Sequence, residues 1–224
     1  MPEIEEILHR WKDTLCGNVS VGGVLARNPV AHKWKATHRS LVLRESVSWR
    51  THDLLTQAQL LYEAGHILGS RILIRSALES VATLIYLNQL TSQVLTGALD
   101  FKTFEQKTST LLLGSRDSST KHTSMSIVSV LEKCEKKYNG ITGIYATLSE
   151  CAHPNFEGIC FGYSDVDFEC KETNFSNKWA SMWADTHESL VKLVCTAFET
   201  EYNHVWKLQM EGLEAWLTTH DAEL

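Results

Sequence analysis

Proline is rare in this chain: only three of its 224 residues are prolines. With 43% hydrophobic and 21% charged residues, the composition is typical of a folded, largely helical protein and excludes a disordered chain. No segment offers the roughly 18 to 20 consecutive, predominantly apolar residues that a membrane-spanning helix needs. The chain begins Met-Pro-Glu-Ile-Glu-Glu, which is acidic where a secretory signal would be basic. We therefore expect a cytoplasmic protein with a single domain, residues 1–224, and no membrane contact.

Motifs of several common enzyme classes are also absent. The six cysteines include no Cys-x-x-Cys pair, the spacing of many zinc sites, and they are too sparse for a disulfide scaffold. There is no glycine-rich phosphate loop, no Gly-x-Ser-x-Gly elbow and no His-Glu-x-x-His helix. These absences argue against NTPases, serine hydrolases and zinc proteases. We expect reduced thiols, and neither a metal ion nor another cofactor.

Positive charge is in short supply as well, because 27 acidic residues outnumber 21 lysines and arginines. The net charge of −6 argues against nucleic-acid binding by the whole surface. The charges are nevertheless separated along the chain: residues 27–53 hold six basic and two acidic side chains, whereas residues 196–224 hold one basic and six acidic ones. Such blocks can bind other molecules, or they can pair within the fold or across a dimer. We favour pairing within the fold or across a dimer.

Helical spacing of apolar residues is what the chain has in abundance. This spacing predicts helices at about residues 3–15, 40–63, 66–90, 101–113, 124–138, 142–152 and 176–218. Strands do not alternate with helices, so we predict an all-α helical bundle whose long helices are antiparallel neighbours. Residues 40–160 would form its core. Residues 1–38 would form a first helix and an irregular basic segment, with a short helical turn after Pro29.

The last predicted helix, residues 176–218, is long and carries a broad apolar stripe that the bundle or another subunit must cover. Before it, residues 156–174 contain glycines and no sustained period, which leaves room for a small hairpin. Four of the seven tryptophans follow residue 178. We expect the tryptophans to anchor the core and interfaces rather than to stack on nucleic-acid bases.

Three charges interrupt the otherwise nearly apolar helix predicted at residues 66–90: Arg71, Arg75 and Glu79, one turn apart. Burying an ion is costly, so these side chains need partners. An exposed pair four residues apart is more favourable with the acid first, and here Arg75 precedes Glu79. The order therefore indicates two side chains that face a shared interior or cleft. They form either an ion pair that fixes helix register, or a site whose guanidinium holds a phosphate or carboxylate.

A second constellation is Leu-Ser-Glu-Cys-Ala-His153-Pro-Asn155, where a predicted helix ends on a histidine followed by proline. The proline restricts the backbone geometry of His153. This histidine is either a cap that interacts with the last helical carbonyls, or a general acid or base at the open end of the bundle.

Together these two segments resemble the HEPN-like superfamily, the higher eukaryotes and prokaryotes nucleotide-binding domain, and particularly its little-characterised bacterial branch. The resemblance covers residues 40–160. It implies a helical bundle that often dimerises and, in active members, a metal-independent RNase toxin of stress and phage-defence systems. Those members carry an arginine followed four to six residues later by a histidine.

This chain departs from the family pattern at one point: five residues before His153, where the arginine is expected, it has Leu148. The Arg-to-His spacing occurs instead at two other places, Arg27 to His32 and Arg116 to His122. Either pair could fold over Arg75 and His153 and supply a phosphate-binding wall.

We therefore predict a HEPN-like protein of a bacterial defence or toxin-type system that binds or cleaves RNA or nucleotide phosphates. The predicted catalytic residues are Arg75, Glu79 and His153, with the arginine stabilising the phosphorane and the histidine moving protons. The predicted phosphate-binding or RNA-binding residues are Arg71, Arg116, His122, Asn155, Arg27 and His32. Expected partners are RNA or a nucleotide, a second copy of the chain, and a partner protein of the defence or toxin–antitoxin system. Two alternatives stay open: a catalytically silent dimerisation or scaffold module, and a small-ligand sensor.

Overall fold

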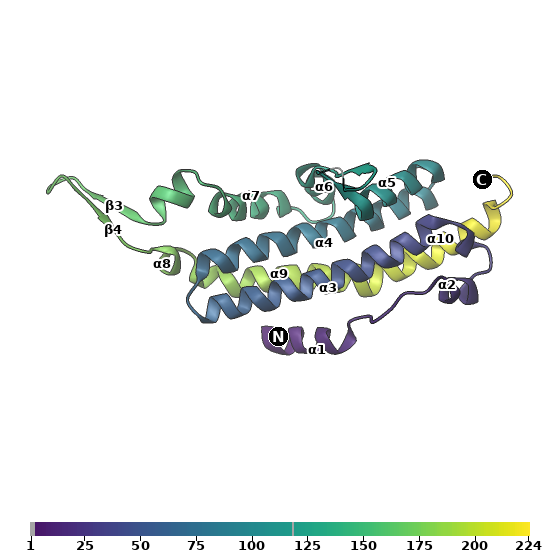
Figure 1. Ribbon diagram of the computed structural model, residues 1–224, viewed down its shortest axis with the longest axis horizontal. Coiled ribbons are helices and arrows are strands. Elements are labelled where there is room, and N and C mark those ends of the chain that lie inside the picture. The colour runs from purple at the N-terminus through teal and green to yellow at the C-terminus, as the bar shows by residue number, and fades with distance from the viewer. Residues whose placement is uncertain (1–2, 118) are drawn as a thin grey trace.

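Two antiparallel helices of 29 residues each, α3 (Lys35–Glu63) and α4 (Ile67–Leu95), form the spine of the molecule (Figure 1). The structure is a computed structural model that describes residues 3–117 and 119–224. A tight turn joins the two helices at Gly65, whose φ of +79° suits a residue without a Cβ. Both helices extend beyond the ranges expected from the sequence, because tertiary packing buries the added turns.

Helix α4 is the centre of the bundle. Within the described residues it lies against seven other α-helices, including α3 on one side and α9 and α10 on another. Nine of its apolar side chains have no exposed surface: Ile74, Ala77, Leu78, Val81, Ala82, Leu84, Ile85, Leu87 and Leu90. A helix that is apolar on nearly all sides is one that the fold surrounds, which explains the composition of this segment.

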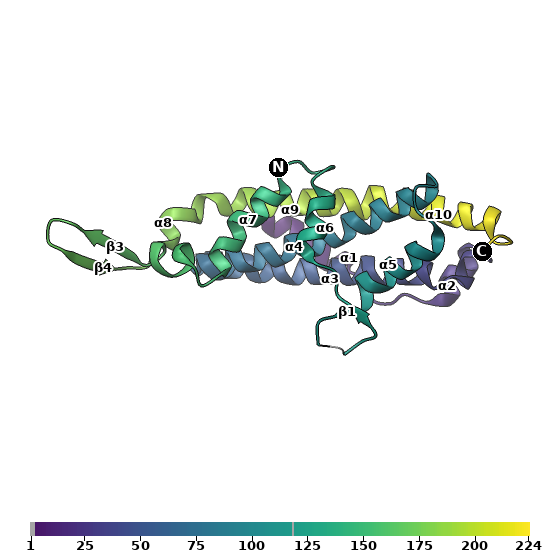
Figure 2. The same cartoon turned by 90° about the horizontal axis from the view of Figure 1, so that it is seen from above.

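Three shorter helices cover one side of α4: α5 (Phe101–Leu113), α6 (Ile127–Cys134) and α7 (Ile141–Ala152). Figure 2 shows them crossing over the spine. The loop between α5 and α6 contains a two-residue parallel pairing of β1 (Gly114–Ser115) with β2 (His122–Thr123). Helix α6 is shorter than the 124–138 expected, because the chain turns after Cys134.

The segment expected to be a single helix at 176–218 is broken. It begins with the short α8 (Trp179–Trp183), passes through a 3₁₀ turn, and continues as α9 (His187–Glu199). A π-helical turn at Thr200–Val205 then connects α9 to α10 (Trp206–His220). The apolar stripe of α9 and α10 is buried against the bundle, so no second subunit is needed to cover it.

The π-helical turn at Thr200–Val205 places the carboxylate of Glu201 in the interior of the bundle. Glu201 is fully buried, and its two oxygens accept hydrogen bonds of 2.7 Å from the Asn88 amide and the Tyr138 hydroxyl. The Lys137 ammonium lies 2.6 Å from the same carboxylate. Burial and the hydrogen bond to Glu201 raise the pKa of Tyr138. Helices α4 and α9–α10 and the segment after α6 are thus joined through one charged group.

The N-terminal segment runs along the outside of α3 as α1 (Ile4–Thr14) and α2 (Val21–Arg27) (Figure 1). Helix α2 was not expected, because Gly22-Gly23 is typical of a loop. It forms because the Ser20 hydroxyl caps it by accepting a hydrogen bond from the Gly23 amide. The helical turn predicted after Pro29 is confirmed at Ala31–Lys33.

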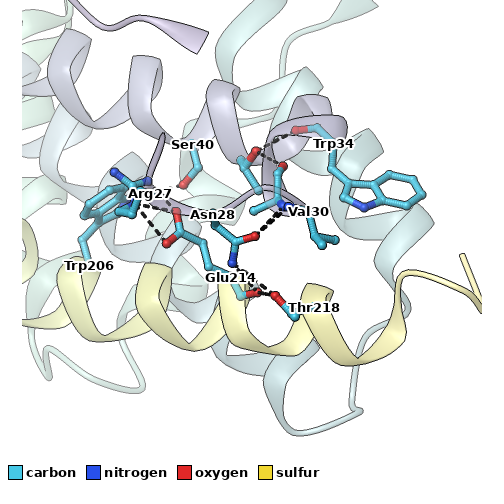
Figure 3. A network of polar contacts seen from close by, with 10 residues as sticks. Arg27, Asn28, Val30, Trp34, Ser40, Trp206, Glu214 and Thr218 are labelled. Carbon is cyan, nitrogen blue, oxygen red and sulfur yellow. Dashed lines mark hydrogen bonds and ion pairs between the residues drawn. The ribbon is translucent and has the colours of Figure 1, made fainter. Parts of the chain in front are cut away.

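The basic N-terminal block pairs with the acidic C-terminal block inside one chain. The pairs between the two blocks are Arg27–Glu214 and Lys33–Asp221, and Arg10 of α1 adds a pair with Glu199; the nitrogen–oxygen distance is 2.5 Å in each. Figure 3 shows the central pair, in which Nε and Nη2 of Arg27 both donate to Glu214. Hydrogen bonding to Glu214 raises the pKa of Arg27. The structure therefore realises the first of the two pairings that the charge distribution favoured.

Beyond the bundle, the chain forms a π-helical turn at Phe156–Phe161 and an antiparallel hairpin of β3 (Ser164–Asp167) and β4 (Glu172–Phe175). The hairpin expected between residues 156 and 174 is thereby confirmed. It projects from one end of the molecule (Figures 1 and 2). Among the described residues, no helix combines the length and apolar character needed to cross a bilayer.

The Arg27–Glu214 pair predicts a stability effect. Arg27→Met removes the guanidinium and leaves the Glu214 carboxylate, whose side chain is 7% exposed, without its charged partner. We expect the free energy of unfolding in urea to fall by roughly 1–2 kcal/mol, since Arg27 itself is partly solvated. The control is Asp13→Ala, which breaks the exposed His9–Asp13 pair and should change stability by less than about 0.5 kcal/mol. Equal losses in the two variants would contradict this account.

Candidate functional site

Arg75 and Glu79 lie on α4 and meet Tyr145 of α7. The Arg75 Nη2 atom donates a hydrogen bond of 2.8 Å to the Tyr145 hydroxyl, which in turn donates to Glu79 Oε1 at 3.1 Å. The same Nη2 atom lies 3.3 Å from Glu79 Oε1. Because the two charged side chains are 21% and 26% exposed, the pair is accessible to solvent rather than sealed in the core.

The two residues open onto a groove of about 590 Å³, which we call the arginine groove. Its long walls are formed by α3 and α4. The end of α5, the loop after α5 and the start of α6 line its third side. The lining residues are Leu43, Ser46, Val47, Arg50, Arg75, Ser76, Glu79, Ser80, Thr83, Leu112, Arg116 and Ile127.

Cations and hydroxyls dominate the polar lining of the arginine groove. Three arginines face one carboxylate, and four side chains carry hydroxyls. Arg50 is held in place, because its Nε donates to the Ser80 hydroxyl at 3.1 Å. Arg75 Nε is buried and has no hydrogen-bond partner among the described residues. Guanidinium forks beside hydroxyl donors are the groups that proteins use to hold phosphate and carboxylate oxygens.

Arg71 is not part of this groove. Its side chain is buried, and it donates to Cys151 Sγ at 3.1 Å and to the Thr186 hydroxyl at 3.0 Å. Its guanidinium also lies over the Trp183 ring, 4.2 Å from the centroid. The contacts of Arg71 therefore connect α4 with α7 and with the turn before α9, so its role is to stabilise the packing of these segments.

The structure does not bring His153 to Arg75 and Glu79. Helix α7 contacts Arg75 through Tyr145, and His153 follows eight residues later, roughly 12 Å further along the helix axis. His153 is exposed and forms the C-cap of α7. Asn155 caps the next turn, since its Oδ1 accepts a hydrogen bond from the Gly158 amide at 2.9 Å. Both residues lie outside the lining of the arginine groove.

The arginine and the histidine of each Arg-to-His spacing have different surroundings. Arg116 is exposed and lines the arginine groove, whereas His122 lies in β2 and pairs through its backbone with Gly114. Arg27 is engaged by Glu214, and His32 lies in the 3₁₀ turn before α3. Of the six predicted phosphate-binding residues, only Arg116 lines the groove.

Several lining residues were missed by the sequence analysis. Arg50 belongs to the basic block at residues 27–53, but nothing in the sequence distinguished it from its neighbours. Ser76, Ser80 and Thr83 share a helix face with Arg75 and Glu79, a spacing that could have been noticed. Tyr145 could not have been found, because its role depends on where α7 packs against α4.

The described residues contain no group of three histidine, cysteine, aspartate or glutamate side chains arranged to hold a metal ion. Burial raises the pKa values of Cys134 and Cys195 to about 12, so these two thiols stay protonated at neutral pH. The polar chemistry of the site is therefore that of arginines, hydroxyls and one carboxylate.

This chain matches no known family model, no curated protein and no solved structure. The HEPN-like resemblance therefore stays a prediction.

The bridging hydroxyl of Tyr145 predicts a measurable effect. Tyr145→Phe keeps the ring but removes the contacts to Arg75 and Glu79, so we expect the free energy of unfolding to fall by about 1 kcal/mol. The control is Tyr163→Phe, which preserves the edge-on contact of that ring with Trp179 and should stay within about 0.5 kcal/mol of the parent. Unchanged stability in Tyr145→Phe would show that the hydroxyl does not organise the pair.

Proposed function

We propose that this chain binds the phosphate groups of RNA or of a nucleotide in the arginine groove. The observation that carries the proposal is the convergence of Arg50, Arg75 and Arg116, from three separate segments, on one hydroxyl-lined groove that contains a single carboxylate. The net charge of the whole chain is −6, so this local excess of cations is confined to one place. The role fits the predicted HEPN-like protein of a bacterial defence or toxin-type system.

Binding is a better match to the groove than cleavage. Metal-independent RNA cleavage needs a base for the 2′-hydroxyl and an acid for the leaving oxygen. Among the described residues that line the groove there is no histidine, and His153 lies at the far end of α7. Glu79 is engaged by Arg75 and Tyr145. The proposed activity is therefore recognition of a phosphate-bearing ligand, without turnover.

The binding test uses a fluorescently labelled single-stranded RNA and measures anisotropy at several salt concentrations. We expect affinity to fall as salt rises, because neutralised phosphates release counterions. Arg116→Ala should weaken binding and reduce the slope of log affinity against log salt by about 0.7, the contribution of one phosphate contact on a single strand. Arg116 is exposed, so its loss should leave the fold intact.

The matched control is Lys207→Ala, which removes an exposed cation of α10 outside the groove. It should bind like the parent protein. Two results would overturn the proposal: no salt-dependent binding by the parent protein, or the same loss in both variants. The RNA should be recovered intact, and cleavage that persists in a chelator would replace binding by nuclease activity.

A second candidate function is self-association through the hairpin end, and a specific observation favours it. Six large apolar side chains are exposed at this end: Phe156, Ile159, Phe161, Val166, Phe168 and Phe175. The hairpin is a two-stranded sheet whose outer edges have no partner strand in the described part of the chain. An identical hairpin is the simplest partner for such an edge, because one two-fold axis satisfies both copies. The occupant that we propose is a second copy of this chain.

Light scattering on the purified protein tests self-association. We expect a mass near twice 25.3 kDa at micromolar concentration. Phe168→Asp should shift the protein toward the monomer, since this side chain is 86% exposed and a charge there would oppose apolar burial. Leu208→Asp alters an exposed apolar residue of α10 and should leave the mass unchanged. A monomeric parent protein would contradict the second candidate.

A further inference from the structure

Trp49 is an exception among the tryptophans. The other six are buried or partly buried, as expected of anchors: Trp11, Trp34, Trp179, Trp183, Trp206 and Trp216. Trp49 lies on α3 and is 51% exposed. A tryptophan exposes a large apolar area to water, and such residues are usually found in the core or at interfaces. The exposure of Trp49 therefore indicates an interaction site.

The Trp49 ring is held in place without being covered. Its Nε1 donates a hydrogen bond of 2.8 Å to the carbonyl of Cys16, in the connection between α1 and α2. This contact fixes one edge of the indole and leaves about half of the side chain in solvent. A ring oriented in this way loses little conformational entropy when a flat ligand stacks on it.

A second groove of about 970 Å³ surrounds this ring, between α3 and the connection after α1. Its volume lies in the range of natural ligand sites. Its polar lining includes Asn18, His52 and Asp53, whose side chains offer hydrogen-bond donors and acceptors beside the ring.

The Trp49 groove and the arginine groove are neighbours on α3. Ser46 and Arg50 line both of them. Arg50 directly follows Trp49 in α3 and donates to Ser80 at the floor of the arginine groove. An exposed aromatic ring therefore lies next to a guanidinium to which the proposed function assigns phosphate binding. This pairing of groups is found where proteins hold single-stranded nucleic acid.

We propose that Trp49 and its groove form a stacking subsite for an unpaired base of the ligand whose phosphates occupy the arginine groove. This inference rests on the proposed function, and it narrows the ligand to one with a free base face, such as single-stranded RNA. Bases inside a duplex are already stacked on their neighbours, so they cannot use the subsite without being unpaired.

The test compares Trp49→Ala with Trp49→Phe. Both variants lose the hydrogen bond to Cys16, but only the phenylalanine keeps an aromatic face, so the pair separates stacking from the structural contact. The probes are a labelled oligoadenylate and an abasic ribose-phosphate oligomer of the same length. We expect Trp49→Ala to bind oligoadenylate about tenfold more weakly than the parent protein, and Trp49→Phe to bind within about threefold of it. The abasic oligomer should bind all three proteins equally.

Leu60→Ala is the matched control, because Leu60 is also an exposed apolar residue of α3, at 60% exposure. It should bind both probes like the parent protein. Equal affinity of Trp49→Ala and the parent for oligoadenylate would overturn the stacking subsite while leaving phosphate binding intact. Failure of the parent to bind either probe would instead overturn the proposed function. A duplex that binds as well as oligoadenylate would also contradict the inference.

Discussion

Burial of α4 on almost every side is the constraint on which the rest of the structure depends. Helices packed around it leave one stripe with partial access to solvent, at Leu68, Ile72, Arg75, Glu79 and Thr83. Arg75 and Glu79 lie on this stripe and keep part of their hydration. Arg71 is buried on the same helix and is compensated instead by Cys151, Thr186 and the Trp183 ring. The arginine groove is therefore the consequence of placing charges on the most buried helix of the bundle.

The outer layers of the molecule are held by charge in addition to apolar packing. The N-terminal segment contributes cations, and α9 and α10 contribute the carboxylates that meet them. Within the basic block, Arg27 and Lys33 are the cations that pair in this way. Arg39 and Arg50 of the same block instead hydrogen-bond to serine hydroxyls, and Arg50 lines both grooves. The cations of the N-terminal segment that pair with the C-terminal carboxylates therefore precede α3 in the chain, whereas Arg39 and Arg50 lie on α3 itself.

The sequence predicted the elements better than their mutual positions. Helix α5 was predicted at its observed bounds, since its apolar spacing and its Gly114 terminus are local features. Helix α2 was not predicted, because the stabilisation by the Ser20 cap offsets the low helix propensity of Gly22 and Gly23. The pairing of Arg75 with Glu79 was predicted from spacing, and its partial exposure was not. The distance of His153 from that pair depends on the position at which α7 packs along α4, and no local sequence pattern determines this position.

The π-helical turn has a mechanical consequence. Glu201 is held from three directions by Asn88, Tyr138 and Lys137, so moving the C-terminal helices by one turn along α4 would strand a charge in the interior. Axial sliding is therefore blocked at the midpoint of the bundle. Relative motion between α4 and the C-terminal helices is therefore expected to be bending or rotation about Glu201 rather than sliding along the helix axis.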